Sequence, residues 1–93
     1  MRVIDRQSAF KRDFKREKLS GKHQNFVAMV GDSLRFLIVD TPLPERYNDH
    51  ALTGNWAGFR ECHIKPDLLL IYEKIGVDVL VLVRLGSHSR LFG

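Results

Sequence analysis

Two almost uninterrupted apolar stretches in the C-terminal half constrain the fold more than any other feature of the sequence. They cover residues 68–73 and 77–85, are rich in branched side chains, and are separated by a short segment that contains Gly76. Such runs are typical of central strands, and the short gap between them favours a turn. The sequence therefore predicts two neighbouring strands at the centre of a sheet.

The start of the chain predicts a short strand followed by a basic helix. The strand spans residues 2–6, and the helix spans 9–18 with Ser8 as its N-cap. Phe10 and Phe14 lie four residues apart, so they share one face of this helix. Lysine and arginine cover most of the remainder. That basic face is either an ordinary solvated surface or a surface for a partner.

A second helix is expected over residues 25–39. Apolar residues recur there at helical spacing from Phe26 to Leu37, and the helix cannot continue through Pro42 and Pro44. Its broad apolar face predicts that this helix packs against the sheet.

Two further strands complete the expected sheet, one over 52–56, interrupted by Gly54, and one over 58–64. The last strand would end at Gly86-Ser87. The order β-α-α-β-β-β-β predicts an α+β fold, a mainly antiparallel sheet with the two N-terminal helices packed on one face. The other face of the sheet would be free to bind something.

Length and composition limit the class of protein. A chain of 93 residues predicts one domain over 1–93. No apolar stretch approaches the ~20 residues of a membrane span, and the N-terminus lacks the apolar run of a signal peptide. We therefore expect a cytoplasmic protein without a membrane partner. The net charge of +4 favours polyanionic partners, and nucleic acid, the ribosome and an acidic protein all remain open.

The single cysteine, Cys62, cannot form an internal disulfide or build a zinc site alone. We expect a small buried strand residue at this position, and a catalytic thiol is the less favoured alternative.

Three histidines in the second half, His50, His63 and His88, are candidates for proton transfer near neutral pH. RNA can be cut without a metal when its own 2′-hydroxyl attacks the phosphate. That reaction needs a base, an acid and cations around the charged phosphorane, and Asp67 and Arg84 could complete such a set. The same side chains could form a metal site, but none of their spacings is a zinc motif. We predict no metal and no cofactor, and a nuclease is one option among several on chemistry alone.

A specific resemblance narrows these options. The residues that carry it are Leu43-Pro44, Asp49-His50-Ala51-Leu52, the run from Gly54 to His63, Asp67, Leu70-Ile71-Tyr72, and the tail from Arg84 to Gly93. Their register resembles the YafQ branch of the RelE toxin superfamily over about residues 42–93. The first 40 residues match only in helical layout. The resemblance implies a RelE-like microbial RNase fold and the toxin of a type II toxin–antitoxin system, a ribosome-dependent endoribonuclease that cleaves mRNA in the ribosomal A site.

The resemblance also implies which residues form the active site. The site residues of the family fall on His50, His63, Asp67, Arg84, His88 and Phe92. We interpret His88 and Asp67 as the acid–base pair. His50 and His63 would position or polarise the phosphate, and Arg84 would stabilise its charge.

Two positions concern contact with the RNA base. Phe92 could stack on a base or orient it. Many relatives carry a tryptophan after the aspartate, whereas this chain has Leu68, so no stacking role is expected there.

The implied partners are the ribosome with its mRNA and a cognate antitoxin of the DinJ or RelB kind, with operator DNA contacted only through the antitoxin. The basic first helix could meet acidic antitoxin residues or ribosomal RNA. Two alternatives remain: a non-catalytic module that acts with its antitoxin as an operator co-repressor, and a superfamily member that acts on free RNA or by another chemistry.

Overall fold

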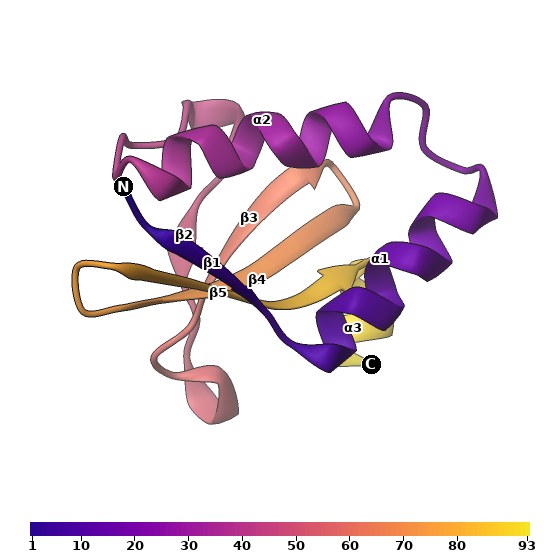
Figure 1. The fold of residues 1–93 in the computed structure, drawn as a ribbon. Coiled ribbons are helices and arrows are strands. Elements are labelled where there is room, and N and C mark those ends of the chain that lie inside the picture. Colours follow the sequence, from indigo (N-terminus) through magenta and orange to yellow (C-terminus); the bar gives the residue numbers. More distant parts are fainter.

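The computed structural model describes residues 1–93 as one five-stranded sheet with three α-helices (Figure 1). In chain order the elements are β1 (Val3–Arg6), α1 (Ser8–Ser20), α2 (Phe26–Ile38), a 3₁₀ helix (Glu45–Tyr47), β2 (His50–Ala51), a second 3₁₀ helix (Gly54–Trp56), β3 (Arg60–Lys65), β4 (Leu68–Ile75), β5 (Val79–Gly86) and α3 (His88–Phe92). The strand order is β1-β5-β4-β3-β2, and only the β1–β5 pair is parallel. The predicted α+β class is confirmed. No helix has the length and apolar character needed to cross a membrane.

The two apolar stretches form the central strands β4 and β5, as predicted. They pair from Ile75 opposite Val79 to Leu69 opposite Gly86. The register shifts between Ile71 and Tyr72, so Val83 is an extra residue on β5. A bulge of this kind reverses the side-chain alternation beyond it.

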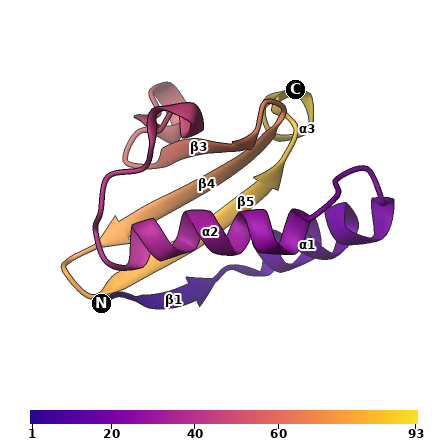
Figure 2. The ribbon, with the colours of Figure 1, turned by 90° about the horizontal axis from the view of Figure 1, so that it is seen from above.

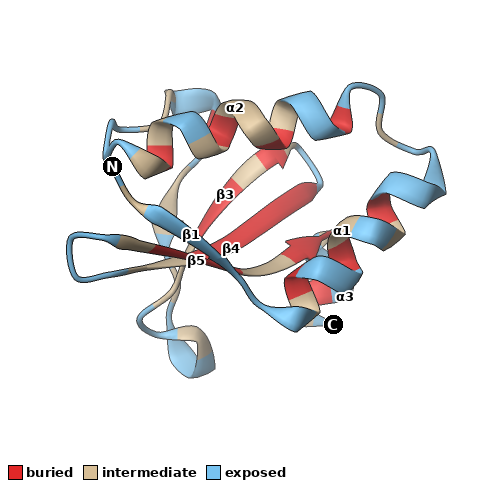
Figure 3. Ribbon diagram, viewed as in Figure 1, coloured by how far each residue is buried: buried red, intermediate tan, exposed pale blue.

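The two long helices cover one face of the sheet, as expected (Figures 1 and 2). Phe10 of α1 and Phe26, Val30 and Leu37 of α2 belong to a thirteen-residue core with the helix-facing residues of the strands. Figure 3 shows that buried positions of α2 face the sheet and that β4 is buried along most of its length. Ser33, which the apolar pattern did not include, is also fully buried and donates its hydroxyl to the carbonyl of Val30 at 2.6 Å.

The opposite face is not wholly free, which corrects the expectation from the sequence. Leu69 and Ile71 of β4 pack there against Leu91 of α3, with Trp56 and Phe92 half-buried around them. The tail after Gly86 forms this small helix because the Ser87 hydroxyl accepts a hydrogen bond from the Arg90 N–H at 3.2 Å.

Two local predictions were wrong. The segment 52–56 is not a strand, because Gly54 adopts φ +64° and opens a 3₁₀ helix; the short strand β2 lies just before it. Ser8 is not an N-cap but the first residue of α1, and Gln7 precedes it without a side-chain cap.

Asp13 and Arg16 of α1 close the open edge of β5. The pairing of β1 with β5 ends at Arg6 opposite Leu82, so Leu85 has no strand neighbour on that side. The Leu85 N–H donates to Asp13 Oδ2 at 3.0 Å, and Arg16 Nη2 donates to the Leu85 carbonyl at 3.0 Å. Two side chains thus bind the backbone groups that a strand would otherwise bind.

Asp13 is the centre of this contact. It is 3% exposed and also accepts hydrogen bonds from Arg84 and Arg16, each at 2.6 Å. Burial would raise the pKa of the Asp13 carboxyl, but the hydrogen bonds from Arg84, Leu85 and Arg16 outweigh burial and hold that pKa below its ordinary value of 3.8. The carboxylate therefore stays charged and binds α1 to the end of β5.

We expect Asp13→Asn to lower the free energy of unfolding by about 3 kcal/mol at pH 7, because it leaves Arg84 and Arg16 without their buried anion. Since the folded pKa of Asp13 lies below the unfolded one, its contribution is complete above about pH 4 and is lost as the pH falls through the folded pKa. Urea unfolding from pH 7 to pH 2 measures this difference. The control is Asp32→Asn on α2, a half-exposed partner of Arg35 alone, which should cost about 1 kcal/mol or less. Equal losses for the two variants would contradict this role of Asp13.

Candidate active site

The predicted site residues lie on the face of the sheet opposite α1 and α2 and at the end where α3 follows β5. Cys62 and Ile64 of β3 point into the helix-covered core, so alternation turns Glu61 and His63 to the other face. His63 pairs with Leu69, and Leu69 pairs with Gly86. The backbones of His63 and Gly86 are therefore two strand spacings, about 10 Å, apart, and His88 follows Gly86 by two residues.

His50 and His63 are brought together over a buried carboxylate. His50 on β2 stands opposite Glu61 on β3. His50 Nε2 lies 2.8 Å from Glu61 Oε2, and His63 Nε2 lies 3.9 Å from the same oxygen. The two rings are 6.4 Å apart between centroids.

Glu61 is a site residue that the sequence reasoning missed. It is 5% exposed, and its second oxygen, Oε1, has no hydrogen-bond partner in the chain. Its position two residues before His63 on one strand was a signal that could have found it, because such residues share a face. What the sequence does not reveal is that His50 would lie across from it.

The His50 ring lies between two oxygen atoms of the protein. Its Nδ1 lies 3.2 Å from the Ala51 carbonyl while Nε2 faces Glu61, so both ring nitrogens point at oxygen acceptors. These two contacts fix the orientation of the His50 ring.

Asp67 and His88 are also brought together, through the backbone of His88. Asp67 lies in the β3–β4 turn, and its Oδ1 accepts a hydrogen bond from the His88 N–H at 3.1 Å. Both side chains are exposed. In the same turn the Pro66 carbonyl lies 3.2 Å from His63 Nδ1, which links the two halves of the site.

Phe92 packs beside His88 rather than extending freely. Their rings are 5.1 Å apart between centroids, and Phe92 also meets Trp56 edge-on at 5.8 Å. Trp56 thus belongs to the small apolar cluster that includes Leu91 of α3. The half-exposed Phe92 ring forms an apolar border to the imidazole of His88.

Arg84 is held by Asp13. The β4–β5 register places Arg84 opposite Ile71, and its Nε donates to Asp13 Oδ2 at 2.6 Å. Its side chain is 28% exposed. The structure therefore does not bring the Arg84 guanidinium into contact with any of the three histidines, and its charge is shared with a buried carboxylate.

Asp49, Arg60 and Tyr72 form the support under His50. The Tyr72 hydroxyl donates to Asp49 Oδ1 at 2.5 Å, and Arg60 Nη2 donates to Asp49 Oδ2 at 3.1 Å. Burial, with the Asp49 hydrogen bond, raises the pKa of the Tyr72 phenol, which therefore stays a neutral donor. The bond to Asp49 raises the pKa of Arg60. These contacts fix the residue before His50 to the sheet.

Cys62 is a buried strand residue, as predicted. It is fully buried, and burial raises the pKa of its thiol, so the thiol remains protonated at neutral pH. A thiolate nucleophile at this position is excluded on those grounds.

The chemistry available on this face is proton transfer and anion binding. Three imidazoles and the exposed Asp67 carboxylate lie there without a nucleophilic thiol. Glu61, His50 and His63 also have donor atoms within 4.8 Å of one another, a set of two nitrogens and one oxygen that fits a divalent transition metal.

Comparisons with known proteins agree with this picture. The family model described as the bacterial toxin of a type II toxin–antitoxin system, YafQ, matches residues 2–93. The chain is 37% identical over 93 residues to the mRNA interferase toxin YafQ of Escherichia coli strain B / BL21-DE3, covering 99% of this chain and 97% of that one.

Solved structures agree as well. The fold is similar to a metal-bound toxin from Helicobacter pylori (41% identity, TM-score 0.88, 99% and 100% of the two chains covered). It is also similar to a chain of the E. coli DinJ-YafQ complex (36% identity, TM-score 0.84, 100% of both chains covered).

We expect Tyr72→Phe to lower the free energy of unfolding by about 1–3 kcal/mol, because the half-buried Asp49 carboxylate loses its shortest hydrogen bond. The imidazole resonances of His50 should shift in NMR spectra while those of His88 stay in place. Tyr47→Phe is a matched control, since that buried hydroxyl contacts only Arg46 at 3.4 Å. A Tyr72→Phe protein as stable as Tyr47→Phe, with unmoved His50 signals, would refute the support role.

Proposed function

This chain belongs to the YafQ family of toxins from bacterial type II toxin–antitoxin systems, and we propose that it is an endoribonuclease that cleaves mRNA in the ribosomal A site and so inhibits translation. The E. coli relative that it resembles over nearly its whole length is named an mRNA interferase toxin. The observation that carries the proposal is the gathering of His50, His63, Asp67 and His88 on the side of the sheet opposite α1 and α2.

The proposed reaction uses the RNA's own 2′-hydroxyl. One member of the Asp67–His88 pair removes the proton of that hydroxyl as its oxygen forms a bond to phosphorus. The bond from phosphorus to the 5′-oxygen breaks, and the other member gives that oxygen a proton. No oxidant or water is consumed, and the product is a cyclic phosphate.

The remaining residues bind and position the substrate. His50 and His63 position the phosphate, whose oxygens gain negative charge in the transition state. Glu61 is a positioning residue that holds His50 from below at 2.8 Å. Arg84 adds positive charge from its place on Asp13, and Phe92 orients the base next to His88.

The proposed partners are the ribosome, mRNA and an antitoxin of the DinJ type, because the similar E. coli chain was solved in a DinJ-YafQ complex. Contact with operator DNA would occur only through the antitoxin. The exposed lysines and arginines of α1 face solvent, so they are available for ribosomal RNA or an acidic antitoxin segment.

A divalent metal at His50, Glu61 and His63 is compatible with the donor set, and the similar H. pylori toxin is metal-bound. Such an ion would supply Lewis-acid chemistry at a phosphate oxygen. It would also take the imidazole lone pairs and the carboxylate that hold His50 in place. We propose that the proton transfers by Asp67 and His88 proceed without it.

The first test of the proposal is His88→Ala. Loss of a general acid or base should slow single-turnover cleavage on programmed ribosomes by about 10²–10⁴-fold. Ribosome binding should change little, since it would depend on many dispersed basic contacts. An exposed histidine should also leave the thermal transition unchanged. If the variant cleaved as fast as the wild type, His88 would have no part in the mechanism. Equal cleavage of naked RNA by the wild type would refute the dependence on ribosomes.

The second test concerns metal. Treating the protein with a chelator that spares Mg²⁺ should leave cleavage unchanged, while one equivalent of Zn²⁺ should slow it, because the ion ties up His50 and His63. Calorimetry should show Zn²⁺ binding that Glu61→Gln weakens and His88→Ala retains. Cleavage that is lost on chelation and restored by Zn²⁺ would show instead that the reaction needs the ion.

A further inference from the structure

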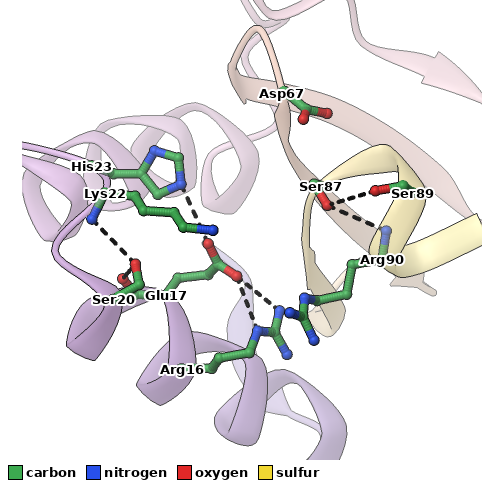
Figure 4. A pocket seen from close by; sticks show the side chains of 9 residues that line it. All are labelled: Arg16, Glu17, Ser20, Lys22, His23, Asp67, Ser87, Ser89 and Arg90. Atoms are coloured by element: carbon green, nitrogen blue, oxygen red, sulfur yellow. Dashed lines mark hydrogen bonds and ion pairs between the residues drawn. The ribbon is translucent and has the colours of Figure 1, made fainter.

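A polar cavity of about 610 Å³ adjoins the candidate active site, between the end of α1 and α3 (Figure 4). One wall contains Ser87, which precedes His88, and Asp67, which accepts a hydrogen bond from the His88 N–H. None of the nine lining residues is hydrophobic. Sites for drug-like small molecules are mostly apolar, so this cavity suits a hydrated ionic group instead.

The cavity holds two cationic side chains that no carboxylate neutralises. Arg16 is already paired with Asp13 at 2.6 Å and with Glu17 at 2.9 Å. Lys22 and Arg90 make hydrogen bonds only through their backbone N–H groups, and neither side chain forms an ion pair. Figure 4 shows these two side chains entering the cavity from opposite walls.

Two arginines also converge at one point of the wall. A Cβ atom on Gly86 would lie 3.0 Å from Arg16 Nη2 and 3.6 Å from Arg90 Cδ. A side chain at residue 86 would therefore crowd Arg16, and glycine leaves room for both arginines at the end of β5. Arg16 is neutralised by its two carboxylates, so the unpaired guanidinium here is that of Arg90, and a guanidinium binds phosphate oxygens through charge-assisted hydrogen bonds.

We propose that this cavity binds the RNA phosphate next to the scissile one, with Arg90 and Lys22 as its ligands. The inference rests on the proposed function, because the scissile phosphate would lie at Asp67 and His88. Since the cavity and the acid–base pair share Asp67, one strand can place consecutive phosphates in the two sites. Phosphate contacts of this kind fix the register of a strand without reading its bases.

The test is the double variant Lys22→Ala/Arg90→Ala on ribosomes programmed with modified mRNAs. Each mRNA carries one uncharged methylphosphonate linkage beside the scissile linkage, on either side in turn. One such linkage should slow single-turnover cleavage by the wild type by about 10- to 100-fold, the loss expected for one or two charge-assisted hydrogen bonds. The double variant should be equally slow on unmodified mRNA and should not be slowed further by that linkage.

Arg6→Ala/Arg35→Ala is the matched control, since it removes two charges from exposed positions outside the cavity. It should respond to the neutral linkage as the wild type does. The Lys22→Ala/Arg90→Ala variant should keep the wild-type thermal transition, because neither side chain forms a hydrogen bond or an ion pair within the chain. The control loses only the exposed Arg35–Asp32 pair and should shift the transition little.

Other outcomes overturn the inference. A double variant that cleaves like the wild type shows that the cavity is not used. A slow double variant that the neutral linkage slows further shows that its cations contact ribosomal RNA instead of mRNA. If the wild type cleaves no message, the nuclease proposal fails. Equilibrium binding to the same programmed ribosomes still tests whether the cavity binds an mRNA phosphate. If it does, the neutral linkage weakens binding of the wild type but not of the double variant.

Discussion

The carboxylate of Asp13 is the contact on which the arrangement of the site depends. β1 is too short to cover β5 to its end, and Asp13 and Arg16 bind the exposed backbone groups of Leu85 in its place. Gly86, Ser87 and α3 follow directly, so the same contact fixes the direction in which the chain leaves the sheet. The position of His88 relative to Asp67 is thus set by a buried ion pair between the first helix and the last strand. A helix that looks from its sequence like a basic surface element acts through its two buried acids, Asp13 and Glu17.

The two faces of the sheet divide stability from chemistry. On β3, Cys62 and Ile64 enter the large core, while Glu61 and His63 stand on the opposite face. The bulge at Val83 has a similar effect on β5, because it lets Leu82 and Leu85, three residues apart, both face the helices. Arg84, between them, donates a hydrogen bond to Asp13 at the edge of the strand. Because core and site alternate along the same strands, a shift of register by one residue would exchange them.

The helices and central strands could be predicted from the sequence because their apolar spacing is a local pattern. The apolar runs identified β4 and β5. Helical spacing identified α1 and α2, with each end predicted to within two residues. Three features escaped prediction because they depend on contacts across the chain. Glu61 acquires meaning only when β2 brings His50 opposite it. The burial of Asp13 depends on its contact with the Leu85 N–H at the edge of β5, far away in the sequence. The helix α3 had a local signal, Ser87 three residues before Arg90, but five residues form a helix only when Leu91 can pack on Leu69 and Ile71.

More residues carry the family resemblance than can take part in proton transfer or phosphate binding. The structure shows what the additional residues do. Asp49 and Arg60 flank the histidines in sequence, yet their charges are directed at each other and at Tyr72, under the sheet residues that carry His50. Trp56 contributes its ring to the support of Phe92. An imidazole can bind a phosphate only where its ring is held in one orientation, and each histidine here has its own support: Glu61 and Asp49 for His50, the Pro66 carbonyl for His63, and Asp67 for the backbone of His88. The long motif is therefore best understood as a small set of reactive groups together with the hydrogen bonds that aim them.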